Sequence, residues 1–106
     1  MMADNETERK IKDELDKPRV VTWTNAIKGF AFKSNRQMEL YARDFPEKGE
    51  AFKDIISFFN KFGDYVSEER LVHIIRSVQK ELGHVNFNMP KLAGIKQYMK
   101  FYERQK

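Results

Sequence analysis

Residues 51–62 read AFKDIISFFNKF, and their apolar side chains recur at steps of three and four positions. Residues 71–82, LVHIIRSVQKEL, repeat this spacing. Such a period is typical of one face of an α-helix, so both segments predict amphipathic helices. The connection between them, residues 63–67, is short enough to make the two helices antiparallel neighbours. A helical hairpin of about residues 50–82 is therefore the expected centre of the fold.

Other residues carry signals for where helices begin and end. Ser34 and Gln37 have the spacing of a capping box. Pro46 is expected to end the helix that they open, because the residue before a proline resists the helical conformation. Residues 47–50 then predict a turn, and Asn88 predicts the N-cap of a last helix.

Residues 19–24 read RVVTWT, and their β-branched and aromatic character suits a strand. The rest of the chain offers no second convincing strand that could pair with this one. A helix is the favoured alternative, because Trp23, Ile27 and Phe30 have helical spacing. The predicted fold class is therefore all-α, a small bundle of four or five helices around the antiparallel helical hairpin of about residues 50–82.

The length of the chain, 106 residues, predicts a single domain with one core. Residues 1–17 are almost entirely polar, and only Ile11 and Leu15 offer apolar contacts there. A lone helix this short is marginal in water. We therefore expect a flexible or partly helical leader over residues 1–17 and a single helical domain over residues 18–106.

Composition narrows the class of protein. There is no cysteine, which excludes disulfide bonds and thiolate metal sites. No apolar run approaches the roughly 18 residues that a membrane span requires, and the N-terminus is too polar for a signal peptide. The sequence thus predicts a cytoplasmic protein with no membrane partner.

Enzymatic signals are missing from the sequence. His73 and His84 are too far apart to match a metal-binding motif, and no P-loop or nucleophile motif is present. Residues 60–71 resemble a calcium-binding loop only superficially, because Phe62 and Leu71 stand where oxygen ligands are needed. We therefore expect no catalysis, no cofactor, no metal and no small-molecule substrate.

Basic residues gather in two segments of the chain. Residues 17–43 hold six lysines and arginines against one acidic residue, and residues 91–106 hold five against one. Residues 1–16 are acidic, with six acidic residues against three basic ones, and residues 44–90 hold eight against six. Positive charge is therefore concentrated on two segments of a chain whose net charge is +4, which favours an anionic partner.

The last predicted helix carries a stripe of positive charge. Lys96, Lys100 and Arg104 recur at every fourth position, which places them on one helix face. Such a row can follow a phosphate backbone, and tyrosines can stack on unpaired bases. The sequence therefore predicts a nucleic-acid-binding surface for DNA or RNA. Its candidate residues are Lys91, Lys96, Lys100, Arg104, Lys33, Arg36, Tyr98 and Tyr102.

The leading hypothesis for function is a non-catalytic accessory protein that binds nucleic acid or a nucleic-acid-processing complex. The alternative is a protein–protein adaptor or inhibitor, or a homodimer, that uses an aromatic surface, since aromatic residues are enriched at interfaces. The candidate interface residues are Phe58, Phe62, Tyr65 and Phe101. Simpler interpretations stay open for both surfaces: the lysines are merely solvated, and the aromatic residues belong to the core.

Overall fold

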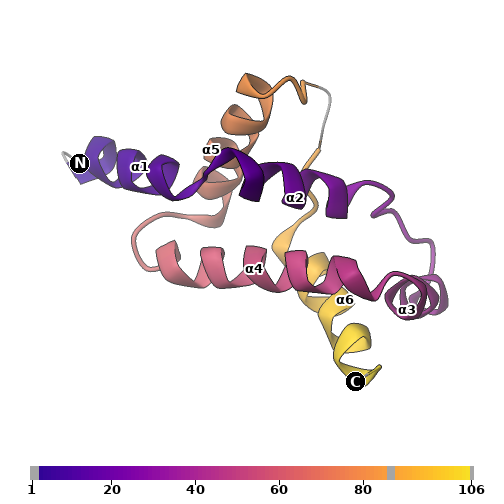
Figure 1. The fold of residues 1–106 in the computed structure, drawn as a ribbon. Coiled ribbons are helices and arrows are strands. Elements are labelled where there is room, and N and C mark those ends of the chain that lie inside the picture. The colour runs from indigo at the N-terminus through magenta and orange to yellow at the C-terminus, as the bar shows by residue number, and fades with distance from the viewer. Residues whose placement is uncertain (1–2, 86–87, 106) are drawn as a thin grey trace.

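The computed structural model describes residues 3–85 and 88–105, with side chains from Glu6 onward. Within these residues the chain forms six α-helices and no strand (Figure 1), which confirms the predicted all-α class. Six helices are one more than the four or five expected, and the additional helix, α1, lies within the predicted leader. The helices are α1 Ala3–Glu14, α2 Lys17–Ile27, α3 Asn35–Asp44, α4 Pro46–Phe62, α5 Glu68–Glu81 and α6 Leu92–Arg104.

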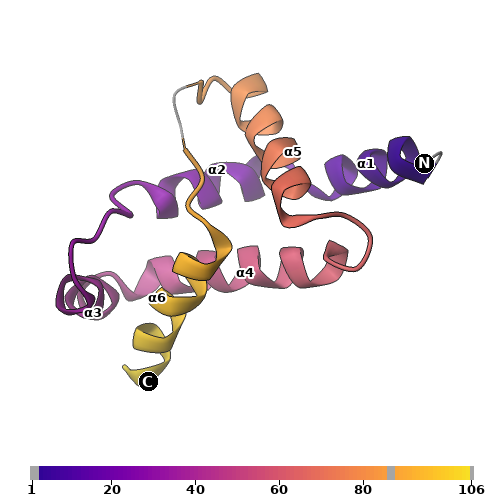
Figure 2. The same cartoon turned by 180° about the vertical axis from the view of Figure 1, so that it is seen from behind.

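Helices α2 and α4 run side by side in opposite directions along the long axis of the molecule. Seen from behind, α6 lies against α4, and α3 closes one end of the molecule beside α6 (Figure 2). None of the helices in the described residues combines the length and the apolar character that crossing a membrane requires.

The segment over residues 19–24 is helical, as favoured over a strand. Helix α2 begins at Lys17, because Asp16 is its N-cap and accepts a hydrogen bond from the Arg19 backbone N–H at 2.7 Å. Pro18 lies in the first turn of α2, where the missing N–H of proline leaves no hydrogen bond unmade. The predicted border between leader and domain, at residues 17 and 18, therefore lies within the first turn of α2.

The capping box of α3 is present in a modified form. Ser34 Oγ accepts a hydrogen bond from the Gln37 backbone N–H at 3.2 Å, whereas the Gln37 side chain accepts one from the Lys33 N–H at 2.9 Å. Helix α3 ends just before Pro46, as predicted, but the same proline opens α4. Residues 47–50 are consequently the first turns of α4, and the predicted turn there is wrong.

The start of α6 also differs from the expectation. Lys91 is the N-cap and makes no side-chain capping bond, and Asn88 lies three residues before it. The Glu68 carboxylate of α5 accepts a hydrogen bond from the Leu92 backbone N–H at 3.4 Å. A side chain distant in sequence therefore takes the place of the local cap that Asn88 was expected to supply.

Helices α4 and α5 do not pack along their length as an antiparallel hairpin. Helix α5 leaves the end of α4 at a steep angle, and α4 packs chiefly on α2 and α6 (Figure 1). The physical reason is the width of the apolar arc of α4, which adds Phe58 and Phe62 to Phe52, Ile55 and Phe59. That arc faces two helices at once, so burying it does not need α5 alongside.

The leader helix α1 packs against α5. Ile11 of α1 and Leu15, the residue just after the helix ends, are both buried. Its acidic side chains pair with the domain: Glu8 with Arg70 of α5, and Glu14 with Lys61 of α4. Burial and charge therefore both hold α1 on the domain.

Candidate nucleic-acid interface

The predicted stripe lies on the exposed face of α6. Lys96, Lys100 and Arg104 are all exposed, because the opposite face of the helix is buried against α3 and α4. Successive members turn by only about 40° around the helix axis, so all three lie on one side of the helix. The buried residues of α6 are Leu92, Ile95, Tyr98, Met99, Phe101 and Tyr102.

Helix α3 lies beside this face. The Gln97 side chain of α6 donates a hydrogen bond to Asn35 Oδ1 at 2.7 Å, which brings the start of α3 next to the stripe. Lys33, two residues before Asn35, is exposed there. Arg36 is exposed as well, but its guanidinium pairs with Glu39 on the same helix at 3.2 Å. Of the two residues predicted near α3, Lys33 is thus the stronger candidate for binding an anion.

Lys33, Lys91 and the stripe residues have no carboxylate partner among the residues that the structure describes. Arg104 instead lies over the Phe101 ring, 5.2 Å from its centroid. Some cations elsewhere in the chain are paired; Lys61 and Arg70, for example, bind acidic side chains of α1. The cations of α6 are therefore available to meet an external anion.

Arg19, by contrast, uses its guanidinium group in several hydrogen bonds within the protein. Its guanidinium donates to both carboxylate oxygens of Asp54, at 2.8 and 2.9 Å, and to the Glu14 carbonyl at 3.2 Å. Asp54 also accepts a hydrogen bond from Trp23 Nε1 at 2.9 Å. Burial alone would raise the pKa of Asp54, but the hydrogen bonds from Arg19 and Trp23 and the charge of Arg19 outweigh it and lower that pKa.

The tyrosines predicted to stack on bases are not accessible. Tyr98 is 0 % exposed and Tyr102 is 5 % exposed, so neither ring can meet a base unless the core opens. The reason is that α6 contacts two helices, which widens its buried arc to include position 98. The Tyr98 ring lies among the rings of Phe30, Phe52 and Tyr41, and burial raises its pKa far above the ordinary value, with smaller contributions from the nearby Tyr41, Glu47 and Tyr102.

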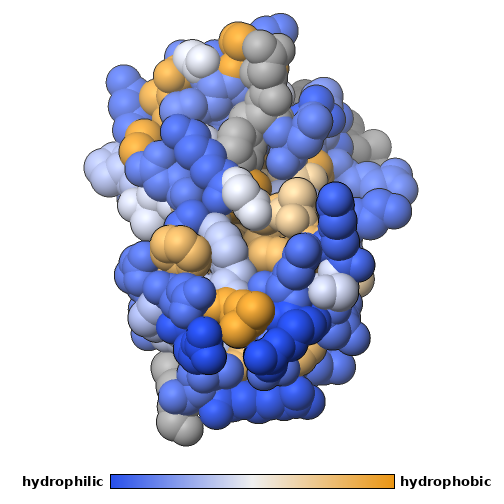
Figure 3. Space-filling view, turned by 90° about the vertical axis from the view of Figure 1, so that its right-hand side faces the viewer, coloured by the Kyte–Doolittle hydropathy of each residue, from blue (hydrophilic) through white to orange (hydrophobic). Residues whose placement is uncertain are grey.

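The aromatic surface of the alternative hypothesis is largely absent. Phe58, Phe62 and Phe101 are buried in the core, and only Tyr65 is exposed, at 76 %. The face drawn in Figure 3 is mostly hydrophilic, with hydrophobic residues in small separate patches. Two exposed apolar residues that the sequence did not single out lie in separate connections: Phe45 between α3 and α4, and Val85 after α5.

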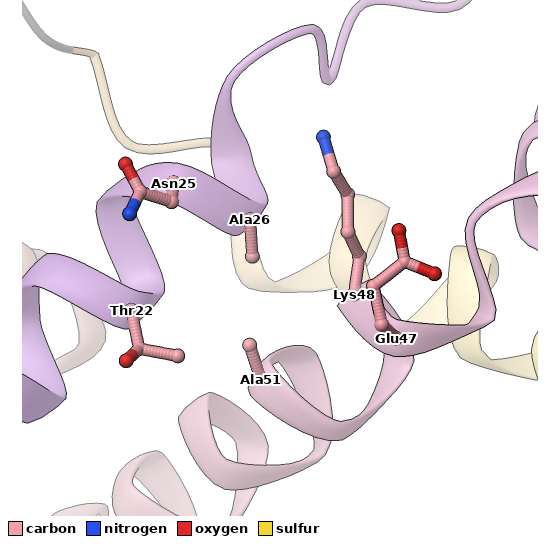
Figure 4. A pocket seen from close by; sticks show the side chains of 6 residues that line it. All are labelled: Thr22, Asn25, Ala26, Glu47, Lys48 and Ala51. Carbon is pink, nitrogen blue, oxygen red and sulfur yellow. The ribbon is translucent and has the colours of Figure 1, made fainter.

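A groove of about 250 Å³ separates α2 from the start of α4 (Figure 4). Ala26 and Ala51 face each other across it, and their small side chains leave the space open. The Lys48 ammonium points away from the groove and donates to the Tyr41 hydroxyl at 2.6 Å and to the Lys28 carbonyl at 3.2 Å. The groove therefore offers few polar groups to a ligand; its other lining residues are Thr22, Asn25 and Glu47.

In the described part of the chain, no three His, Cys, Asp or Glu side chains lie close enough together to hold a metal ion.

Comparisons of the chain with models of protein families, with curated proteins and with solved structures gave no significant match. The positively charged face of α6 is thus the feature with the clearest chemical preference.

Proposed function

We propose that this chain is a non-catalytic accessory protein of the cytoplasm that binds nucleic acid, either free or within a nucleic-acid-processing complex. The binding surface is the exposed face of α6, with Lys96, Lys100 and Arg104 on the phosphate backbone and Lys33 and Lys91 in support. One observation carries the proposal: three cations stand in a row on one helix, and none of them forms an ion pair with a described carboxylate.

The geometry of the row suits a phosphate backbone. From residue 96 to residue 104 the helix axis rises about 12 Å. Over that length one strand of DNA presents roughly three to four phosphates. Because the tyrosines of α6 are buried, the contacts are electrostatic and carry little sequence information.

The test compares two triple variants with the wild-type protein. Lys96→Gln/Lys100→Gln/Arg104→Gln removes the stripe, and glutamine preserves helix propensity. We expect its affinity for fluorescent DNA or RNA oligonucleotides to fall at least about tenfold at moderate salt. The matched control, Lys10→Gln/Lys12→Gln/Lys53→Gln, removes the same charge from exposed positions on α1 and α4.

The control should bind within about twofold of wild type, because its three lysines lie outside the proposed interface. An equal loss in both variants would mean that only net charge matters, and the assignment to α6 would fail. Binding of a protein from the same cells that is insensitive to salt would instead favour the adaptor hypothesis, because apolar contacts are hardly screened.

A further inference from the structure

A second cationic feature lies at the C-terminal half of α5, away from α6. A hollow of about 340 Å³ is lined there by His73, Arg76, Ser77, Lys80, His84 and Val85. The first four occur at steps of three, one and three, so they share one face of α5. This is the face opposite the apolar residues that α5 buries, which are Leu71, Ile74, Ile75 and Val78.

His84 joins this face through a turn that glycine permits. Gly83 has a φ of +95°, a left-handed conformation that ends the helix. The His84 backbone N–H then donates to the Gln79 carbonyl at 2.8 Å, which folds the chain back against the end of α5. A second imidazole is thereby added to a surface that a straight continuation of the chain would leave without it.

The lining of the hollow is cationic. Arg76 and Lys80 carry permanent charges and have no ion-pair partner among the described residues. The lining residues include no carboxylate; Glu69 and Glu81, also on α5, are not among them. Ser77 adds a hydroxyl, and the imidazoles of the two histidines add further hydrogen-bonding nitrogens.

We propose that this hollow binds the phosphate group of a small phosphomonoester. A guanidinium with a fixed fork of N–H donors, an ammonium and a hydroxyl are the groups that recognise a phosphate. The two histidines alone would suggest a metal ion, but Arg76 and Lys80 would repel a cation. Val85, at 63 % exposure, adds an apolar surface beside the charged groups for the part of the molecule that carries the phosphate.

This site is independent of the proposed nucleic-acid interface. It uses α5 and the turn after it, whereas that interface uses α6 and the residues before α3. Removing the α6 stripe should therefore leave phosphate binding unchanged, and each proposal can fail without the other.

The test follows the imidazole resonances of His73 and His84 by NMR while the protein is titrated separately with inorganic phosphate and with a nucleoside 5′-monophosphate. We expect both resonances to shift in a saturable way, and chloride at the same ionic strength to leave them in place. Equal affinity for the two probes would identify free phosphate as sufficient. Tighter binding of the monophosphate would show that the carrier contributes.

Variants separate specific binding from general charge. Arg76→Gln/Lys80→Gln should weaken phosphate binding at least about tenfold, because it removes both charge-assisted donors. The control Arg9→Gln/Lys12→Gln removes the same charge from exposed positions on α1 and should bind as wild type does. Equal weakening in both variants, a chloride response equal to that of phosphate, or no saturable shift would overturn the proposal.

Discussion

Gly49 of α4 lies directly against the ring of Tyr102 in α6. A Cβ atom at Gly49 would stand 2.2 Å from Tyr102 Cε1, far inside van der Waals contact. The ring is buried, and its hydroxyl lies 3.3 Å from Glu50 Oε1, within hydrogen-bond distance. Glycine at this position therefore allows α6 to approach α4 closely, and this approach positions the helix that carries the basic stripe.

Replacing Gly49 by alanine should lower the stability of the protein. The added Cβ would displace the Tyr102 ring and overpack the core, which costs about 1–3 kcal/mol of unfolding free energy. This cost exceeds the gain of up to about 1 kcal/mol from better helix propensity. Urea unfolding measures the difference. Gly94→Ala in α6 is the matched control, because its Cβ would meet only Phe30 Cε1 at an ordinary 3.8 Å. That variant should gain about 0.5–1 kcal/mol, and a loss like that of Gly49→Ala would contradict the close-contact account.

Two tyrosines of α6 should respond differently to loss of the hydroxyl. Tyr98 Oη is buried with no hydrogen-bond partner in the described residues, so Tyr98→Phe should leave stability unchanged or raise it by up to about 1 kcal/mol. Tyr102→Phe removes the contact with Glu50 and should lower stability by roughly 0.5–1.5 kcal/mol. Thermal and urea unfolding of both variants provide the comparison. A loss in Tyr98→Phe as large as that in Tyr102→Phe would reveal a partner for Tyr98.

The Asp54 carboxylate should make the stability of the protein depend on pH in the acidic range. Its pKa is lowered from the ordinary 3.8 in the folded protein. The carboxylate therefore contributes stability that is fully present above the unfolded-state pKa and is lost as the pH falls through the folded-state pKa. Unfolding free energies of wild type and Asp54→Asn between about pH 5 and pH 2 measure this contribution.

Asp54→Asn should be less stable than wild type at neutral pH, by about 1 kcal/mol after allowance for the partial exposure of the pair. The difference should shrink as the pH falls, because the wild-type carboxylate becomes protonated. A constant gap across this range would mean that the charge of Asp54 does not stabilise the fold.

Local signals in the sequence predicted the helices well. The three-and-four spacing identified the buried faces of α4 and α5, and Ser34 caps α3 as expected. These features depend on residues within one or two turns of one another, so a single sequence contains them. Prolines are ambiguous on this scale, because Pro46 can end one helix and also begin the next.

Packing between distant residues was not predictable in the same way. The steep departure of α5 from α4 depends on which helices fill the two sides of α4. The burial of Tyr98 follows from contacts of α6 with both α3 and α4. His84 reaches the face of α5 only because Gly83 adopts a left-handed conformation. The sequence shows that a glycine is present, but it does not show in which direction the chain turns there.

The dependence of nucleic-acid affinity on salt tests the central claim most directly. The slope of log K against log salt should be shallower by roughly 2.7 in Lys96→Gln/Lys100→Gln/Arg104→Gln than in wild type, since each lost phosphate contact contributes about 0.9 on double-stranded DNA. The control Lys10→Gln/Lys12→Gln/Lys53→Gln should keep the wild-type slope. Equal slopes for wild type and the stripe variant would contradict the assignment of phosphate contacts to α6.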